Sequence, residues 1–413
     1  MSHTRPRSFI YGLALLALLS MSACQATVTA ALGNTRSITP TASPRPTGNP
    51  TRVPALAAAS PRPTQTPRPT AASTPTPVPA VIRAIRVDYA NVKTSRSEVN
   101  ALEQKMIAAQ TNLVAIGAGR LDWTYFKWKD HADSWSSDVK DTNLDFLAED
   151  AARFGKWASV NAVVDVFAPR YIAAHPQSAA VSWLGKTSDQ LVSTMQLVEG
   201  DFGRQLLDML NYIAANYPVD SISITELSYY IDGYGDDDKA AYLAYTHRSD
   251  WPRNPLGLVA IDDPSIGQWR SYEIGRFLQR AADVVHRHGK QLYLDVEVSW
   301  NNLALEAADR GQSYAVMLQS ADRLVLWDYF GLSHYRPDYT AQLAQYMQKY
   351  GSDRIIISIG LWTNSNNPIS PTALRQAMQS GLQSPLPNLW ITPSRYLTDQ
   401  HWQVLTDLWG TQK

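Results

Sequence analysis

Two acidic side chains stand inside an otherwise apolar stretch of the sequence, QLYLDVEVSW at residues 291–300. Side chains alternate between the two faces of a strand, so Asp295 and Glu297 share one face with Tyr293, while leucine and valine occupy the other. A carboxylate inside an apolar core is costly unless it is paired or hydrogen-bonded. Paired carboxylates can instead perform acid–base chemistry, one donating a proton while the other stays ionised.

Other apolar runs in the sequence also carry an acid near their end, namely Asp88, Asp165, Glu226 and Asp328. A single such acid is explained by a structural ion pair, for example between Arg86 and Asp88, but the repetition favours a water-accessible acidic pocket. Aromatic residues accompany the acids, and we interpret them, with Asp88 and Asp165, as substrate-binding residues: Trp123, Tyr229, Tyr230, Trp300, Trp327 and Trp362. Flat rings stack on the C–H faces of sugars, and carboxylates accept hydrogen bonds from hydroxyls.

The elements that must position these residues are short β-rich runs separated by amphipathic helical stretches. Strand–helix alternation favours a parallel sheet, and eight units after residue 80 predict an α/β protein with a (β/α)8 TIM barrel. A doubly wound open sheet is the alternative, although no Gly-rich phosphate loop follows the first run. Barrel active sites lie at the carboxyl ends of the strands, where these acids would meet. The predicted strands are 84–92, 112–118, 160–168, 219–227, 291–300, 323–330, 354–362 and 388–394.

The first 24 residues have the pattern of an export signal. Arg5 and Arg7 precede an apolar run at 9–19, and the sequence MSAC follows at 21–24. A basic start, a short apolar region and small residues before the cut are typical of a secretory signal peptide. A cysteine after small residues resembles a bacterial lipobox, which predicts a lipid on Cys24 and a membrane anchor. An ordinary signal peptide with a chance cysteine is the alternative.

Residues 25–80 repeat proline and threonine with few large apolar side chains, which predicts a disordered tether. Of the 37 basic residues, seven arginines lie in the first 80 positions, which leaves 30 against 37 acidic residues in the rest. This mildly acidic body argues against a nucleic-acid partner. We expect a monomeric domain at 81–413, held by the lipid on Cys24 at the extracellular face of a bacterial cell envelope.

Several segments resemble the glycoside hydrolases of the family-10-like barrel group, over roughly residues 84–300. The relevant segments are VDSISITELSYYIDGYG at strand four, FAPRYIAAHPQSA after strand three, and the Trp-Arg pair that precedes strand five. Asp220, Ile222, Glu226 and Tyr230 fall on that group's strand-four pattern. Thr225 stands where the group has the first of two acids, and Ser221 replaces its glycine.

The resemblance implies a glycoside hydrolase that cleaves a polysaccharide or oligosaccharide. We expect Glu226 to be its general acid, with Asp295 or Glu297 as the partner carboxylate and Asp328 next. A non-catalytic carbohydrate-binding lipoprotein on the same scaffold is the alternative, supported by Thr225. A lyase or deacetylase is a third interpretation. We expect no metal and no cofactor.

Overall fold

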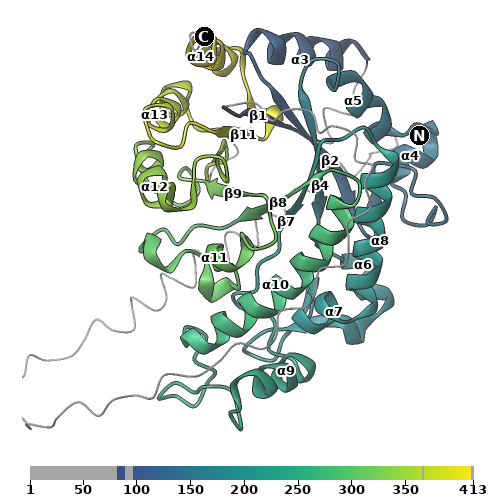
Figure 1. Cartoon of the computed structure of the whole chain (residues 1–413), viewed down its shortest axis with the longest axis vertical. Coiled ribbons are helices and arrows are strands. Elements are labelled where there is room, and N and C mark those ends of the chain that lie inside the picture. Colours follow the sequence, from purple (N-terminus) through teal and green to yellow (C-terminus); the bar gives the residue numbers. More distant parts are fainter. Residues whose placement is uncertain (1–80, 89–95, 365–366, 411–413) are drawn as a thin grey trace, which may run out of the picture. The chain divides into compact units, whose positions relative to one another are not determined.

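The computed structural model describes residues 81–88, 96–364 and 367–410, and these form a (β/α)8 TIM barrel (Figure 1). The barrel is closed, because β1 pairs in parallel with both β2 and β11. Its strands are β1 (Arg83–Val87), β2 (Leu113–Arg120), β4 (Ser159–Asp165), β7 (Ser221–Thr225), β8 (Gln291–Val296), β9 (Arg323–Asp328), β10 (Ile355–Gly360) and β11 (Leu389–Thr392). Three short strands lie outside this ring: β3 (Trp123–Thr124), β5 (Ala179–Val181) and β6 (Thr187–Val192).

Helices follow the strands and surround the barrel (Figure 1). They are α3 (Arg96–Ala108), α4 (Ser137–Thr142), α5 (Phe146–Phe154), α6 (Pro169–Ala174), α7 (Thr194–Val198), α8 (Asp201–Asn216), α9 (Asp236–Thr246), α10 (Pro264–His286), α11 (Tyr314–Met317), α12 (Tyr339–Met347), α13 (Pro371–Leu382) and α14 (Asp399–Trp409). Several begin with the residues that helix starts favour. Asp263 caps α10 and Ser370 caps α13, each followed by proline at the first helical position.

Each of the eight predicted strand runs overlaps one barrel strand, so the predicted fold class is confirmed and the open-sheet alternative is wrong. The predicted signal peptide at 1–24, the lipidation of Cys24 and the tether at 25–80 lie outside the described residues. Among the helices of the described residues, none combines the length and the apolar character that crossing a bilayer requires.

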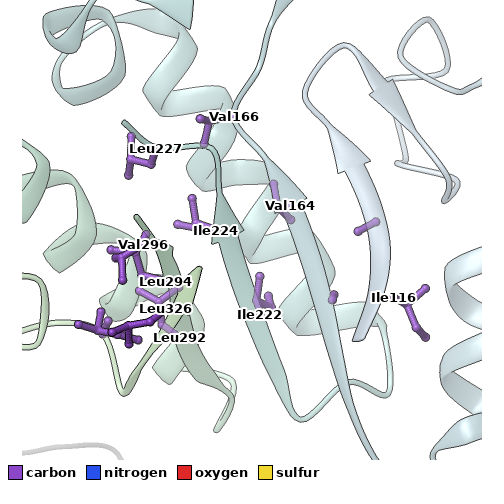
Figure 2. Close-up of a cluster of buried hydrophobic side chains, with 14 of the residues drawn as sticks. Ile116, Val164, Val166, Ile222, Ile224, Leu227, Leu292, Leu294, Val296 and Leu326 are labelled. Atoms are coloured by element: carbon purple, nitrogen blue, oxygen red, sulfur yellow. The ribbon is translucent and has the colours of Figure 1, made fainter. Parts of the chain in front are cut away.

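Alternation along the strands separates an inner core from an outer one. Inward side chains form a small buried cluster of Ile82, Ala84, Leu113, Ala115, Val163, Tyr293, Val325, Ile356 and Trp390. Outward side chains such as Ile224, Leu294 and Leu326 belong to the larger core that the helices cover (Figure 2). On β7 the inward positions are Ser221, Ser223 and Thr225, all buried. The interior of the barrel is therefore partly polar before the strands end.

The long segment between β7 and β8 has a core of its own, built from Tyr234, Tyr242, Trp251, Val259, Ile266 and Trp269. Arg270, the second residue of the Trp-Arg pair, is fully buried beside it. Its guanidinium donates a hydrogen bond to the carbonyl of Asp232 at 2.6 Å and lies over the ring of Tyr234, 4.5 Å from the centroid. The pair thus anchors the loop after β7 to α10.

Candidate active site

Glu226 directly follows β7 and has a left-handed backbone, with a φ of 64°. Ile222 and Ile224 face the outer core, so alternation alone would turn Glu226 outward as well. The left-handed backbone breaks that alternation, and the carboxylate of Glu226 is close enough to Asp165 and Asp295 of neighbouring strands for their charges to affect its pKa. Positive φ is uncommon in residues other than glycine and often marks a functional position.

Glu226 and Asp165 form a pair of carboxyl groups with different proton affinities. Burial, and after it the negative charge of Asp165, raises the pKa of Glu226 to about 8. Burial also raises the pKa of Asp165, to about 6, although the N–H of Phe167 donates a hydrogen bond to Asp165 at 2.8 Å and opposes this shift. Both residues keep some exposure. Near neutral pH the pair therefore holds one proton, mainly on Glu226.

The side chain of Asp295 faces the barrel interior, which accounts for an acid inside the otherwise apolar strand β8. Continued by one residue, the β7–β8 register places it opposite Thr225, the residue before Glu226, and it is only 3% exposed. Burial raises its pKa to about 6, while the charge of Arg86, the Thr225 hydroxyl and the Trp327 indole lower it. Oδ1 of Asp295, the Thr225 hydroxyl and the Trp327 indole N–H each lack a hydrogen-bond partner of ordinary geometry. Thr225 and Trp327 therefore lie near Asp295 without forming a well-aligned hydrogen bond to it.

Arg86 supplies positive charge among these acids, a role that the sequence analysis did not assign to it. It lies on β1 two residues after Ala84, whose side chain belongs to the inner cluster. Its charge lowers the pKa values of Asp165, Glu226 and Asp295. The sequence could have indicated this role, because alternation along β1 places the side chains of Ala84 and Arg86 on the same inward face.

Two further predicted acids are held in ion pairs at the same end of the barrel. Glu297 lies just beyond β8, where Nε of Arg310 approaches its carboxylate at 2.8 Å and the Ser228 hydroxyl also donates to it. Asp88 follows β1 and lies 3.4 Å from the guanidinium of Arg395, whose backbone N–H donates to it at 3.2 Å. Both acids add negative charge near the site but are already paired.

The structure does not bring Asp328 to the other predicted acids. Leu324 and Leu326 on β9 belong to the outer core, and Asp328 has the same direction. It is fully buried and accepts a hydrogen bond from the Thr340 hydroxyl on α12. Burial alone raises its pKa, to about 7, against that single hydrogen bond. Asp328 therefore lies between sheet and helix rather than in the barrel mouth.

Aromatic rings line the barrel interior beside Asp295 and Glu226. Trp327 stacks on Tyr329, with centroids 5.3 Å apart and planes 10° from parallel, and Tyr329 contacts Trp362 at 5.0 Å. Tyr329 was missed by the sequence analysis, yet it interacts electrostatically with Asp295 and Glu226. The alternation from Val325 through Trp327 would have placed it inside.

The remaining predicted aromatic residues lie elsewhere. Trp123 and Trp300 pack against the outer core, and Tyr229 is buried within it. Tyr230 is partly exposed, with the guanidinium of Arg310 4.6 Å from its ring centroid. Two of these four contact Arg310, which pairs with Glu297: Tyr230 through its ring and Tyr229 through its backbone N–H, which donates to the Arg310 carbonyl at 3.1 Å.

The arrangement has the parts for proton transfer between a carboxyl group and a bound substrate. It contains a protonated acid in Glu226, an ionised neighbour in Asp165, a cation in Arg86 and a ring face in Tyr329. Within the described residues, no group of three His, Cys, Asp or Glu side chains has the arrangement that a metal ion needs. The carboxyl groups gathered here have the chemistry that general acid–base or nucleophilic catalysis requires.

Comparison with solved structures identifies barrels of the same fold. The chain is similar to the PgaB (BpsB) glycoside hydrolase domain from Bordetella bronchiseptica, with a TM-score of 0.59 and 16% identity over 81% of this chain and 100% of that one. It is also similar to the catalytic domain of the β-amylase from Paenibacillus polymyxa, with a TM-score of 0.55 and 9% identity over 80% and 98% of the two chains. No family model and no curated protein matches the sequence. At these identities the likeness establishes the fold, a (β/α)8 barrel shared with glycoside hydrolases.

Proposed function

We propose that the protein is a glycoside hydrolase in which Glu226 is the general acid and Asp165 the partner carboxylate. The observation that carries this proposal is the convergence of Glu226, Asp165 and Asp295 at the carboxyl ends of three strands, with pKa values of about 8, 6 and 6. Glycoside hydrolysis needs two carboxyl groups in opposite protonation states. Burial and mutual repulsion provide that difference at neutral pH.

Asp165 replaces Asp295 and Glu297 as the preferred partner because it is accessible and unpaired with a cation at close range. Asp295 is almost completely buried, and Glu297 is engaged by Arg310. In the proposed reaction Glu226 protonates the glycosidic oxygen as the bond from the anomeric carbon to that oxygen breaks. Asp165 then stabilises the cationic sugar, either directly or by deprotonating the water that attacks it. Asp295 and Arg86 lie beneath the reacting pair, where the positive charge of Arg86 partly offsets the negative charge of the carboxylates.

We propose a polysaccharide or oligosaccharide as the substrate. The stacked rings of Trp327 and Tyr329, with Trp362 beside them, offer an aromatic wall next to the acids. Rings of this kind pack on the apolar faces of sugars, while carboxylates accept hydrogen bonds from their hydroxyls. The solved structures with similar barrels described above are carbohydrate-active enzymes by their names, which supports the same substrate class for this chain.

The test is the release of reducing ends from a panel of polysaccharides by the wild-type protein and by Glu226→Gln. We expect the variant to lose at least about a hundredfold in kcat, the range typical of a missing general acid. Asp150→Asn is the matched control, because Asp150 is also a buried acid with a raised pKa but lies on α5. Equal activity of Glu226→Gln and wild type would refute the assigned role of Glu226.

The alternative is a carbohydrate-binding protein without catalysis, and Thr225 is the observation that favours it. Thr225 occupies the position of an acid in the resembled group, and its hydroxyl faces Asp295. This alternative predicts glycan binding by the wild-type protein that Glu226→Gln retains, with no reducing ends released from any member of the panel. Release by wild type excludes it.

We also propose that Cys24 carries a lipid that tethers the barrel to the outer face of a bacterial envelope. The basic start, short apolar run and MSAC sequence support this proposal. Metabolic labelling with a fatty-acid probe should label the wild-type protein in the membrane fraction, while Cys24→Ala should be unlabelled and released. An unlabelled wild-type protein would favour an ordinary signal peptide.

A further inference from the structure

The ends of β7 and β8 separate just where the candidate acids are located. The last paired residues of the two strands are Ile224 and Leu294. Three residues further on each strand the same register would pair Leu227 with Glu297, directly after Glu226. The left-handed conformation of Glu226 interrupts β7 before that pair can form. Some other group must then fix the distance between the two strand ends.

The side chain of Gln312 lies where the backbone pairing of Leu227 with Glu297 would otherwise be. Its Oε1 accepts a hydrogen bond from the N–H of Glu297 at 2.9 Å, and its Nε2 donates to the carbonyl of Leu227 at 2.8 Å. A single side-chain amide thus joins the two residues that the register would have paired. Gln312 is 1% exposed, so both hydrogen bonds are shielded from water.

The segment that carries Gln312 is itself fixed against α10. Gly311 has a φ of 83°, and a Cβ there would lie 2.8 Å from the Cβ of Arg270. Only glycine permits this close approach in a left-handed conformation. The guanidinium of Arg270 donates to the carbonyls of Asp309 and Tyr230, each at 3.3 Å. Arg270 thereby connects the loops that follow β7 and β8.

We propose that Gln312 is a positioning residue that sets the separation between Glu226 and the carboxylate of Glu297 by clamping the ends of β7 and β8. The inference rests on the proposed hydrolase function for its catalytic consequence. The side-chain amide of Gln312 bridges the backbones of Leu227 and Glu297. The Ser228 hydroxyl and the Arg310 guanidinium then hold the carboxylate of Glu297. Glu226 is the neighbour of Leu227, so its position follows from the clamp.

Loss of the clamp would act on geometry and charge together. The two strand ends would move apart, which displaces Glu226 from the substrate position, and a displacement of about 1 Å can cost about a hundredfold in rate. The negative charge of Glu297 is one of the causes that raise the pKa of Glu226. Greater separation would lower that pKa, so the proton would be lost, and with it the activity, at a lower pH than in the wild type.

The experiment compares the wild type, Gln312→Met and Gln312→Asn, the second of which retains an amide but is one methylene too short to bridge both partners. Gln291→Met is the control, because Gln291 lies at the opposite end of β8 and accepts a hydrogen bond from Tyr293. We expect kcat to fall ten- to a hundredfold in both Gln312 variants with KM nearly unchanged. We also expect the alkaline limb of the pH–rate profile to move to lower pH, and the control to match the wild type.

A second measurement keeps the inference testable if no glycan in the panel is cleaved. Glutamate labelled with ¹³C at Cδ allows the titration of Glu226 to be followed by NMR, with Glu226→Gln identifying the signal. A lower pKa of Glu226 in the Gln312 variants supports the clamp, whether or not the hydrolase proposal holds. An unchanged pKa, or a lower melting temperature with unchanged kcat and pH profile, would show that Gln312 merely stabilises the fold and would overturn the inference.

Discussion

Asp165 and Asp328 end two strands of the same barrel, and both are carboxylates whose pKa is raised by burial. Asp165 faces inward, where Glu226 and Arg86 share its electrostatic environment. Asp328 faces outward, where the Thr340 hydroxyl on α12 is the group that moderates its pKa. A raised pKa is therefore common to both faces of the sheet, whereas a neighbouring carboxyl group of different proton affinity distinguishes the inward face.

This difference shows which property marks a candidate site. Burial of one acid alters its own titration and the stability of the fold. Two acids that repel each other beside a shared cation can remain in opposite protonation states, which is what acid–base catalysis needs. The contrast between the inward and outward acids can be tested by making the same substitution, acid to amide, at both positions.

The largest expected effect comes from replacing each acid with its amide. Asp165→Asn should lower kcat for glycan hydrolysis by at least about a hundredfold, because it removes the partner carboxylate. Asp328→Asn should change kcat by less than about threefold, since its side chain contacts α12 rather than the barrel interior. Steady-state kinetics on one polysaccharide decides the matter, and equal losses in the two variants would remove the distinction between the faces.

The second prediction concerns stability, where the inward and outward acids should behave alike. Glu226 has a folded-state pKa of about 8 and Asp328 one of about 7, both above their ordinary values of 4.5 and 3.8. The folded protein therefore binds more protons than the unfolded chain in these windows, and stability falls as pH rises through each window. Relative to wild type, stability should increase between pH 5 and pH 8.5 by about 4 kcal/mol in Glu226→Gln and by about 3 kcal/mol in Asp328→Asn.

Urea unfolding at both pH values measures this gain. A constant difference between variant and wild type across the pH range would contradict the raised pKa of the residue replaced. Together with the kinetic comparison, the measurement separates an acid that only destabilises the fold at high pH from one that also performs chemistry.

The sequence contains enough information to make part of this distinction. The alternation that turns Tyr293 and Asp295 inward also turns Leu324, Leu326 and Asp328 outward, because the three share one face of β9. Applied strictly, alternation would have removed Asp328 from the candidate site. It would also have added Arg86 and Tyr329 by the same reasoning. The barrel itself was predictable because eight runs of strand and helix repeat with clear hydrophobic periods.

The rest of the site depends on contacts that no periodicity encodes. Alternation predicts an outward Glu226, and nothing in the residue type signals its left-handed backbone, since glutamate rarely adopts one. Arg310 pairs with Glu297 from a loop that follows β8, and Gln312 bridges two strand ends from the same loop. Loop conformations of this kind follow from tertiary packing. The sequence therefore makes Glu226 a candidate by its place at the end of an apolar run and by the family resemblance, but it does not predict the direction of the side chain.

The third prediction sharpens the role of the cation on the inward face. Arg86→Met should raise the pKa values of Asp165 and Asp295, because the guanidinium charge lowers both. The acidic limb of the pH–rate profile should then move up by about one pH unit, with activity near pH 5.5 reduced about tenfold relative to wild type. Arg86→Lys keeps the charge and should restore most of that activity. A limb that stays in place in Arg86→Met would exclude this electrostatic role.

The smallest expected effect compares aromatic residues on the two faces. Trp362 contacts Tyr329 beside the acids, whereas Trp300 stacks on Tyr335, 5.0 Å between centroids, against the outer core. Loss of one ring from a sugar-binding wall removes about 1 kcal/mol of stacking, so Trp362→Ala should raise KM about fivefold at unchanged kcat. Trp300→Ala should lower the melting temperature while leaving KM unchanged, because its ring packs on other protein side chains. A larger KM effect in Trp300→Ala than in Trp362→Ala would place substrate binding outside the barrel mouth, on the side of the aromatic cluster around Trp300.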